Sequence, residues 1–123
     1  MQLGMIGLGR MGANMTERLL KGGHRVVGFD PKPEAVQRVV EKGAVKADSL
    51  ERLAQQLTPP RILWLMVPSG EPVDQTIQAL LPHLTKNDVI VDGGNSNYKD
   101  SLRRAAMLKK RGLQFVDVGT SGG

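Results

Sequence analysis

A glycine-rich turn near the N-terminus has the residue types and spacing of a phosphate-binding loop. The apolar run 3–6 leads directly into a G-x-G-x-x-G sequence, and a helical pattern of apolar residues follows. In such a turn the glycines allow a tight bend, close approach of the backbone to a pyrophosphate, and close packing of helix on strand. Amide groups at the start of the helix then face the anion. We therefore expect a nucleotide to contact Gly7, Leu8, Gly9, Arg10, Met11 and Gly12.

A carboxylate follows at the distance that a dinucleotide site requires. Asp30 ends the apolar run 25–29 and lies 18 residues after the last glycine of the motif, close to the roughly 20 expected for a ribose-binding acid. We expect Asp30 to accept hydrogen bonds from the adenosine ribose and to repel a 2′-phosphate, which favours NAD over NADP. Lys32 partly offsets this repulsion, so NADP stays open. The alternative is that Asp30, Pro31 and Lys32 only form the turn before the next helix.

Three further groups of small or polar residues follow apolar runs. Val67, Pro68 and Ser69 either line the ribose and nicotinamide side of the cofactor or form an ordinary turn in which Ser69 caps the next helix. Asn95 carries an amide that both donates and accepts hydrogen bonds. A hydroxyl and backbone N–H groups are offered to a carboxylate by Ser121, Gly122 and Gly123. Without further context, the two interpretations of residues 67–69 are equally supported, whereas the groups around Asn95 and residues 121–123 are more often loops with helix caps than binding sites.

Short apolar runs alternate with amphipathic helical patterns along the whole chain, which is typical of βαβ units. Asp48 with Glu51 three residues later predicts a helix start, as does Pro72. We predict an α/β fold of the Rossmann type, a doubly wound and mainly parallel sheet with helices on both faces, which binds ligands outside the carboxyl ends of its strands. The expected strands are residues 3–6, 25–29, 62–67, 89–91 and 114–118, with 44–46 as a short edge strand.

Composition limits the class of protein. The 123 residues, 40% of them hydrophobic, suffice for one domain. There is no cysteine for a disulfide, a metal thiolate or a nucleophile, and no apolar run approaches the roughly 18 residues of a membrane span. The first residues do not resemble a secretory signal, so we expect a cytoplasmic protein that does not bind membranes. A P-loop phosphotransferase is disfavoured, because the sequence has no G-x-x-x-x-G-K-[ST] motif.

The charge of the chain favours an anionic partner. Lys and Arg number 17 against 12 Asp and Glu, a formal net charge of +5. Aromatic residues make up only 3%, which leaves few side chains to stack on bases and argues against nucleic acid as the partner. We interpret the densest basic stretch as a solvated helix face rather than a binding patch. It comprises Arg103, Arg104, Lys109, Lys110 and Arg111.

Three segments together resemble the N-terminal part of the decarboxylating 6-phosphogluconate dehydrogenase family, within the β-hydroxyacid dehydrogenase superfamily. The resemblance covers essentially the whole chain. The glycine loop is shared with 3-hydroxyisobutyrate-type enzymes, whereas the other two segments are more specific to the branch that acts on sugar acids. The segments are Gly7-Leu8-Gly9-Arg10-Met11-Gly12-Ala13-Asn14-Met15, Asp92-Gly93-Gly94-Asn95-Ser96 and Val118-Gly119-Thr120-Ser121-Gly122-Gly123.

The resemblance implies a role for each predicted site residue. Residues 7–12, 30–32 and 67–69 would contact the cofactor, residues 121–123 would contact the substrate, and Asn95 would contact both. Many family members have an Asn-Arg-Thr-like sequence where this chain has Asp30-Pro31-Lys32, a pattern suited to NADP. This departure supports NAD here and leaves dual specificity open.

The reaction that the family implies is oxidation of 6-phosphogluconate at its C3 hydroxyl by hydride transfer to the nicotinamide. Loss of CO2 then gives ribulose 5-phosphate, without a metal. The reaction needs a general base and a general acid, which in the family are a lysine and a glutamate beyond Gly123. We therefore expect no catalytic residue in this chain and no turnover by it alone. Four other titratable residues are interpreted as structural or solvent-facing: His24, His83, Lys99 and Lys109.

The resemblance also implies a domain organisation. We expect residues 1–123 to form an NAD(P)-binding domain that is incomplete at its C-terminus and lacks the helical second domain of the parent enzyme. The parent is expected to be a homo-oligomer. Two other functions stay open, a dehydrogenase of another 3-hydroxy acid such as 3-hydroxyisobutyrate, and a dinucleotide-binding module without catalytic activity.

Overall fold

Strands and helices alternate along the chain, as the sequence predicts. The computed structural model describes residues 1–94 and 96–118. The short edge strand is confirmed, and the other strand ends lie within two residues of the predicted ones. The elements are β1 (Gln2–Ile6), α1 (Arg10–Lys21), β2 (Arg25–Phe29), α2 (Pro33–Val40), β3 (Val45–Lys46), α3 (Leu50–Gln55), β4 (Ile62–Leu65), α4 (Glu71–Leu80), the 3-10 turn η1 (Leu81–His83), β5 (Val89–Asp92), α5 (Tyr98–Lys110) and β6 (Gln114–Asp117).

The six strands form one sheet in the order β3-β2-β1-β4-β5-β6. Every pair is parallel; Met5 of β1, for example, lies between Gly28 of β2 and Trp64 of β4. The chain winds outward from β1 to one edge and then from β4 to the other, which is the Rossmann order. The predicted doubly wound sheet is confirmed. Because the winding reverses between β1 and β4, a crevice opens there at the carboxyl ends of the strands.

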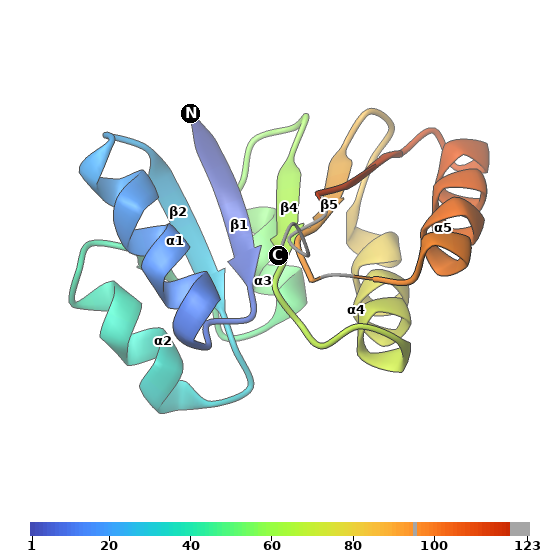
Figure 1. Ribbon diagram of the computed structural model, residues 1–123. Helices are drawn as coiled ribbons and strands as arrows, with labels where there is room; N and C mark the ends of the chain where they lie inside the picture. Colours follow the sequence, from blue (N-terminus) through green and yellow to red (C-terminus); the bar gives the residue numbers. More distant parts are fainter. Residues whose placement is uncertain (95, 119–123) are drawn as a thin grey trace.

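Helices pack on both faces of the sheet (Figure 1). On one face, α1 and α2 cover a cluster that includes Met5 and Val26. On the other face, α3, α4 and α5 cover a larger cluster in which Leu63, Leu65 and Leu108 are fully buried. Strand residues therefore alternate between two apolar layers, as expected for a parallel sheet. Both layers hold the strand ends in fixed positions.

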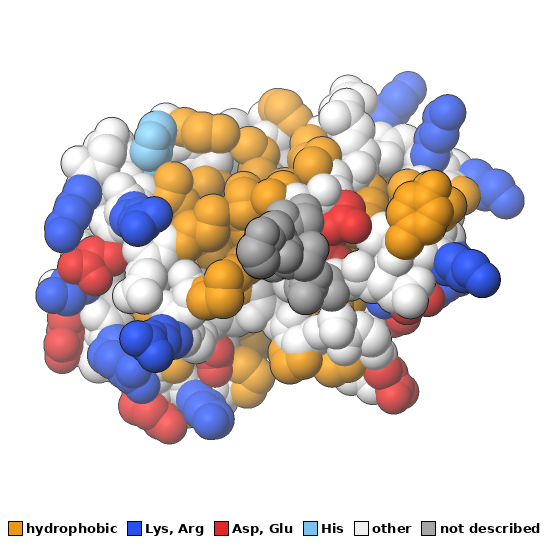
Figure 2. All heavy atoms as spheres, in the orientation of Figure 1, with side chains coloured by type: hydrophobic (Ala, Val, Ile, Leu, Met, Phe, Trp, Pro, Cys, Tyr) orange, Lys and Arg blue, Asp and Glu red, His pale blue; other side chains and the backbone are white. Residues whose placement is uncertain are grey.

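Hydrophobic side chains gather in the middle of the face that carries α1 (Figure 2). A groove of about 370 Å³ lies there and is lined mainly by apolar side chains of α1, of β4 and of the residues that directly follow β4 and β6, namely Met11, Met15, Trp64, Met66 and Val118. The longest helix is α5, with 13 residues. Within residues 1–94 and 96–118, no helix combines the length and apolar character needed to cross a membrane.

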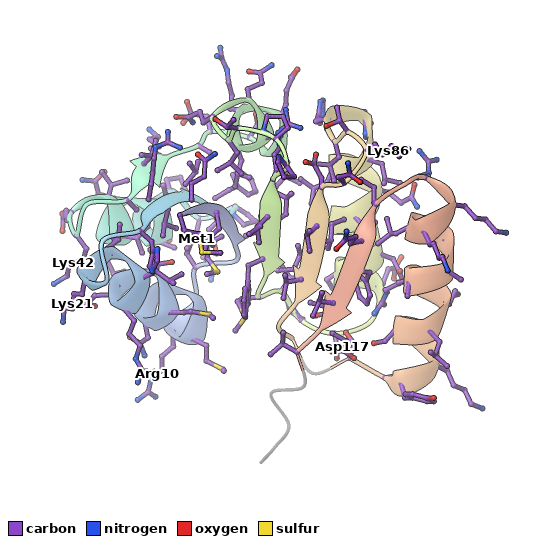
Figure 3. All side chains as sticks on the ribbon, turned by 90° about the horizontal axis from the view of Figure 1, so that it is seen from above. Met1, Arg10, Lys21, Lys42, Lys86 and Asp117 are labelled. Atoms are coloured by element: carbon purple, nitrogen blue, oxygen red, sulfur yellow. The ribbon has the colours of Figure 1, made fainter. Side chains whose placement is uncertain are left out.

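The edge of the sheet at which the strands begin is held by a buried ion pair. The Asp88 carboxylate is completely buried. It accepts hydrogen bonds from the backbone N–H of Arg61 at 2.6 Å and of Thr85 at 2.8 Å, and it pairs with Arg61 Nη1 at 2.9 Å. Lys86 marks this edge in Figure 3, whereas Arg10 and Asp117 lie at the opposite, carboxyl edge. The loops with the predicted site residues leave the sheet at the carboxyl edge.

The start of α3 differs from the sequence-based prediction by one residue. Ser49, not Asp48, is the N-cap, and its hydroxyl accepts a hydrogen bond from the backbone N–H of Arg52 at 3.1 Å. Asp48 is exposed and pairs with Lys46 at 3.4 Å. The chain is still bound to the sheet at Ala47, whose N–H donates to Gly28 at 3.1 Å, so helical backbone begins only after Ser49.

Candidate functional site

The glycine loop is tied to the end of β2 by two backbone donors. The N–H of Gly7 donates to the carbonyl of Phe29 at 3.0 Å, and the N–H of Leu8 donates to Asp30 Oδ2 at 2.7 Å. Gly7 has a φ of 99°, a conformation that only glycine adopts readily. The Leu8 side chain is buried in the apolar layer, so Leu8 contributes its backbone, and not its side chain, to the surface of the loop. The loop is thus fixed by contacts within the chain.

The first turn of α1 is open to an anion. Gly9 is the N-cap and offers no side-chain cap, and the first turn carries no acidic residue. A Cβ at Gly12 would collide with the carbonyl oxygen of Gly7, whereas a Cβ at Gly9 would meet nothing within 4 Å. Gly12 therefore serves packing, and the space above Gly9 remains for a ligand. Free N–H groups and the positive end of a helix dipole suit a pyrophosphate there.

Both carboxylate oxygens of Asp30 accept hydrogen bonds from backbone N–H groups on its own side of the cleft. Besides Leu8, it accepts a hydrogen bond from the backbone N–H of Lys32 at 2.9 Å. Lys32 is the N-cap of α2, and Pro33 is its first helical residue. Asp30 therefore shapes the turn before α2, which is the structural role that the alternative interpretation gave to residues 30–32. Each oxygen of a carboxylate accepts more than one hydrogen bond, so this structural role leaves room for ribose hydroxyls.

Two adjoining cavities lie at the carboxyl edge. The larger, about 970 Å³, extends from the glycine loop and residues 30–32 to Met66, the start of α4 and Gly94. The smaller, about 550 Å³, lies between Phe29, Glu34 and Lys46. Asp30 and Pro31 line both cavities, so the two cavities adjoin at these residues. Glu34 and Asp48 also line the smaller cavity, but Asp30 is the carboxylate that both cavities share. This position suits contact with the ribose of a dinucleotide.

The loop after β4 forms the other wall of the cleft. Val67 and Pro68 line it, whereas Ser69 is exposed and is not part of the lining. The alternative that Ser69 caps α4 is wrong, because the N-cap is Gly70 and no side chain caps this helix. The lining also includes Gln75 and Thr76, which the sequence analysis missed. They follow Pro72 by three and four residues, a spacing that places them on the same face of α4.

The turn after β5 packs directly against the loop after β4. A Cβ at Gly94 would lie 2.5 Å from the carbonyl oxygen of Val67, so only glycine allows this approach. Buried Asp92 shapes the turn, since its Oδ1 accepts from the N–H of Gly94 at 2.9 Å and its Oδ2 accepts from the Ser96 hydroxyl. The predicted binding residues Asn95, Ser121, Gly122 and Gly123 lie outside the described residues.

Arg104 corrects the interpretation of the basic stretch as a solvated helix face. Arg103, Lys109, Lys110 and Arg111 are exposed, but Arg104 is completely buried. It shares the inner face of α5 with Ser101 and Leu108. The burial of Arg104 was not predicted, because its spacing of three and four from these neighbours is a weak signal for a charged side chain. Burial of a charge requires a partner, and the structure supplies carboxylates from two other elements.

Asp74 of α4 is the first of these partners. Its carboxylate accepts hydrogen bonds from Arg104 Nε at 2.8 Å and Nη2 at 3.2 Å, and from exposed Arg103 at 3.0 Å. The hydrogen bonds from Arg104, and then those from Arg103, lower the pKa of Asp74 to about 2 against the opposing effect of desolvation. Arg104 Nη2 also donates to the carbonyl of Gly70 at 3.1 Å. The second partner is Asp92, whose Oδ2 lies 3.8 Å from Arg104 Nη1.

The other titratable residues that the sequence singled out lie outside the cleft. Lys99 and Lys109 are exposed on α5, His24 precedes β2, and His83 lies in η1. None of them lines the two cavities at the carboxyl edge. Among the described residues, no group of three His, Asp or Glu could hold a metal ion.

Comparison with known proteins identifies relatives over nearly the whole chain. The sequence model of the family described as the NAD binding domain of 6-phosphogluconate dehydrogenase matches residues 2–123. The NAD(+)-dependent, decarboxylating 6-phosphogluconate dehydrogenase of Haloferax volcanii is 49% identical over 123 residues, which are 100% of this chain and 40% of that protein. The chain thus spans about two fifths of the length of this relative.

Two solved structures share the fold. The 3-hydroxyisobutyrate dehydrogenase of Mycobacterium tuberculosis, solved with L-serine, superposes with a TM-score of 0.89 at 27% identity, over 99% of this chain and 41% of that one. The 6-phosphogluconate dehydrogenase of Plasmodium falciparum, solved in apo form and in complex with NADP+ and with 6-phosphogluconate, gives 0.84 at 29% identity, over 94% of this chain and 26% of that one.

The lowered pKa of Asp74 predicts an acid-sensitive contribution to stability. A carboxylate whose pKa is lower in the folded state stabilises the fold above its unfolded pKa, and this contribution disappears as the pH falls through the folded value. Asp74→Asn should therefore lower the free energy of unfolding by about 1 kcal/mol near neutral pH, a value reduced for solvent screening because the side chain is 35% exposed. The difference from wild type should shrink as the pH falls from about 4 to about 2.

Urea unfolding at a series of pH values measures this difference. Asp100→Asn is the matched control, because Asp100 is also partly exposed and lies 3.5 Å from the same Arg103, whereas the hydrogen bonds of Arg104 go to Asp74 and Gly70. Its difference from wild type should stay small at every pH. A difference for Asp74→Asn that is independent of pH down to the acid limit would contradict the assignment of the lowered pKa.

Proposed function

The chain belongs to the family of the NAD binding domain of 6-phosphogluconate dehydrogenase, and from this premise we propose that the cleft at its carboxyl edge binds NAD. The proposal is carried by the Leu8–Asp30 hydrogen bond of 2.7 Å, which fixes an anion-binding loop and a ribose-binding carboxylate in one unit. The pyrophosphate would lie above Gly9 at the start of α1. The adenosine ribose would contact Asp30, and the nicotinamide side would lie along Val67 and Pro68.

Asp30 is the basis for proposing NAD rather than NADP. Backbone donors from Leu8 and Lys32 hold both of its oxygens, so the carboxylate cannot turn away without breaking these bonds. A 2′-phosphate in the same place would meet a fixed negative charge. The exposed side chain of Lys32 offsets only part of this repulsion. The relative from H. volcanii is described as NAD(+)-dependent, whereas the P. falciparum enzyme was solved with NADP+, so the family contains both preferences.

For the complete enzyme we propose NAD-dependent oxidative decarboxylation of 6-phosphogluconate to ribulose 5-phosphate and CO2. The bound nicotinamide supplies a hydride acceptor. The residues of this chain bind and orient the cofactor, and Asn95, Ser121, Gly122 and Gly123 are proposed to bind the substrate. The general base and general acid that the reaction requires are proposed to come from outside residues 1–123. The chain alone would therefore bind the dinucleotide without turning over the sugar acid.

The glycines of the loop predict two different mutational effects. Gly9→Ala should leave the melting temperature close to that of wild type, because its Cβ meets no atom of the protein, and should weaken NAD binding by about tenfold or more through a clash with the pyrophosphate. Gly12→Ala should lower the melting temperature itself, because its Cβ collides with Gly7. Calorimetric titration with NAD and a thermal melt of each variant separate the two effects. Unchanged NAD affinity in a folded Gly9→Ala protein would contradict the proposed site.

Turnover tests the proposed reaction. The complete protein that carries this chain should be assayed for reduction of NAD and of NADP, each with 6-phosphogluconate and with 3-hydroxyisobutyrate. We expect NAD to be reduced with 6-phosphogluconate, with release of CO2. Reduction of NADP alone would show that Lys32 outweighs Asp30. Reaction with 3-hydroxyisobutyrate alone would reject the proposed substrate, and dinucleotide binding without any turnover would favour a non-catalytic module.

A further inference from the structure

Arg104 is buried behind the cleft. Its contacts extend to two loops of the cleft, the loop after β4 and the turn after β5. It is completely buried and does not line the cleft itself. On one side it holds the loop after β4 (residues 66–70) through the carbonyl of Gly70 at 3.1 Å, and the adjoining helix through Asp74 at 2.8 Å. On the other side its Nη1 faces Asp92 at 3.8 Å. Asp92 in turn holds the turn after β5 through Gly94 and Ser96.

The number and direction of these contacts require a guanidinium group. Nε and Nη2 point toward Asp74 and Gly70, while Nη1 points toward Asp92. A lysine has one nitrogen and cannot reach α4 and β5 at once. Nη1 has no hydrogen-bond partner among the described residues. By contrast, the partly buried Arg61 at the amino edge bonds with Ala54 and Asp88 at 2.9 Å each.

We propose that Arg104 is a positioning residue that fixes the loop after β4 relative to the turn after β5. This inference rests on the proposed function, in which the first loop contacts the nicotinamide side and the second carries Asn95 toward the substrate. The separation of the two loops then sets the distance between the hydride acceptor and the carbon that gives up the hydride. A misplacement of about 1 Å costs up to about a hundredfold in rate, so the fixed separation matters for turnover more than for NAD affinity.

The proposal predicts a split between rate and affinity. In the complete protein, Arg104→Met should lower kcat by about tenfold or more. The Kd for NAD should change by less than about threefold, because the glycine loop and Asp30 make no contact with Arg104. Arg104→Lys should not restore kcat, since one amine cannot bridge both loops. The measurements are steady-state kinetics, calorimetric titration with NAD, and a thermal melt of each variant.

Two matched controls separate positioning from stability. Arg61→Met removes a partly buried arginine that pairs with buried Asp88 at the opposite edge, so it should lower the melting temperature while kcat at a permissive temperature stays within about twofold of wild type. Arg103→Met removes an exposed arginine that shares Asp74 but does not reach Gly70 or Asp92, and its kcat should also stay close to wild type. Wild-type kcat in folded Arg104→Met, or an equal loss of kcat in Arg61→Met, would overturn the proposal.

A second variant keeps the test decisive if Arg104→Met does not fold. Asp92→Asn keeps the size of the side chain and an acceptor for Gly94 but removes the ion pair with Arg104, so it should lower kcat in a folded protein; wild-type kcat would overturn the proposal. If wild type shows no turnover, the proposed function fails on its own. Hydrogen exchange then tests the role of Arg104, because Arg104→Met should speed exchange in both loops, and unchanged exchange would reject it.

Discussion

The hydrogen bond from the Leu8 N–H to Asp30 is the interaction on which the site depends most. It joins the turn after β1 to the end of β2 at 2.7 Å and uses a charged acceptor, which makes it stronger than a neutral hydrogen bond. The same carboxylate faces the cleft. The residue that shapes the glycine loop is therefore the residue that would select the cofactor, and contacts within the chain alone fix the proposed anion site. Preorganisation of this kind reduces the entropic cost of binding.

A parallel sheet makes this double role of Asp30 possible, because the carboxyl ends of all its strands lie at one edge. The loops after β1, β2, β4 and β5 meet there, although the chain between them crosses the sheet. The apolar layers on the two faces fix the strands, but they do not fix the loops. Charged residues perform that task at two points, Asp30 on the side of β1 and β2, and Arg104 with Asp74 and Asp92 on the side of β4 and β5. The loops of each half of the cleft are thus fixed by a separate set of charged residues.

Local patterns explain how much of this the sequence could predict. The strands, the doubly wound fold class, the glycine loop and the position of Asp30 at a strand end follow from periodicity, spacing and the alternation of strand and helix patterns. Arg104 could not be found this way, because its burial depends on carboxylates 30 and 12 residues away in the chain that only the folded sheet brings together. The cap at Ser49 was missed by one residue because the strand contact at Ala47 delays the helix. The roles of Asn95, Ser121, Gly122 and Gly123 stay predictions.

Mapping the backbone amides that respond to NAD tests directly whether the cleft at the carboxyl edge, with the Leu8–Asp30 hydrogen bond, binds the cofactor. Backbone NMR spectra of this chain, recorded during a titration with NAD, report each loop separately. We predict that shifts concentrate in residues 7–12, 30–32 and 66–70, with the Leu8 amide among the most affected because its partner Asp30 gains a ligand. Shifts confined to the opposite edge, around Lys86 and Gly112, or no shifts at millimolar NAD, would contradict this prediction.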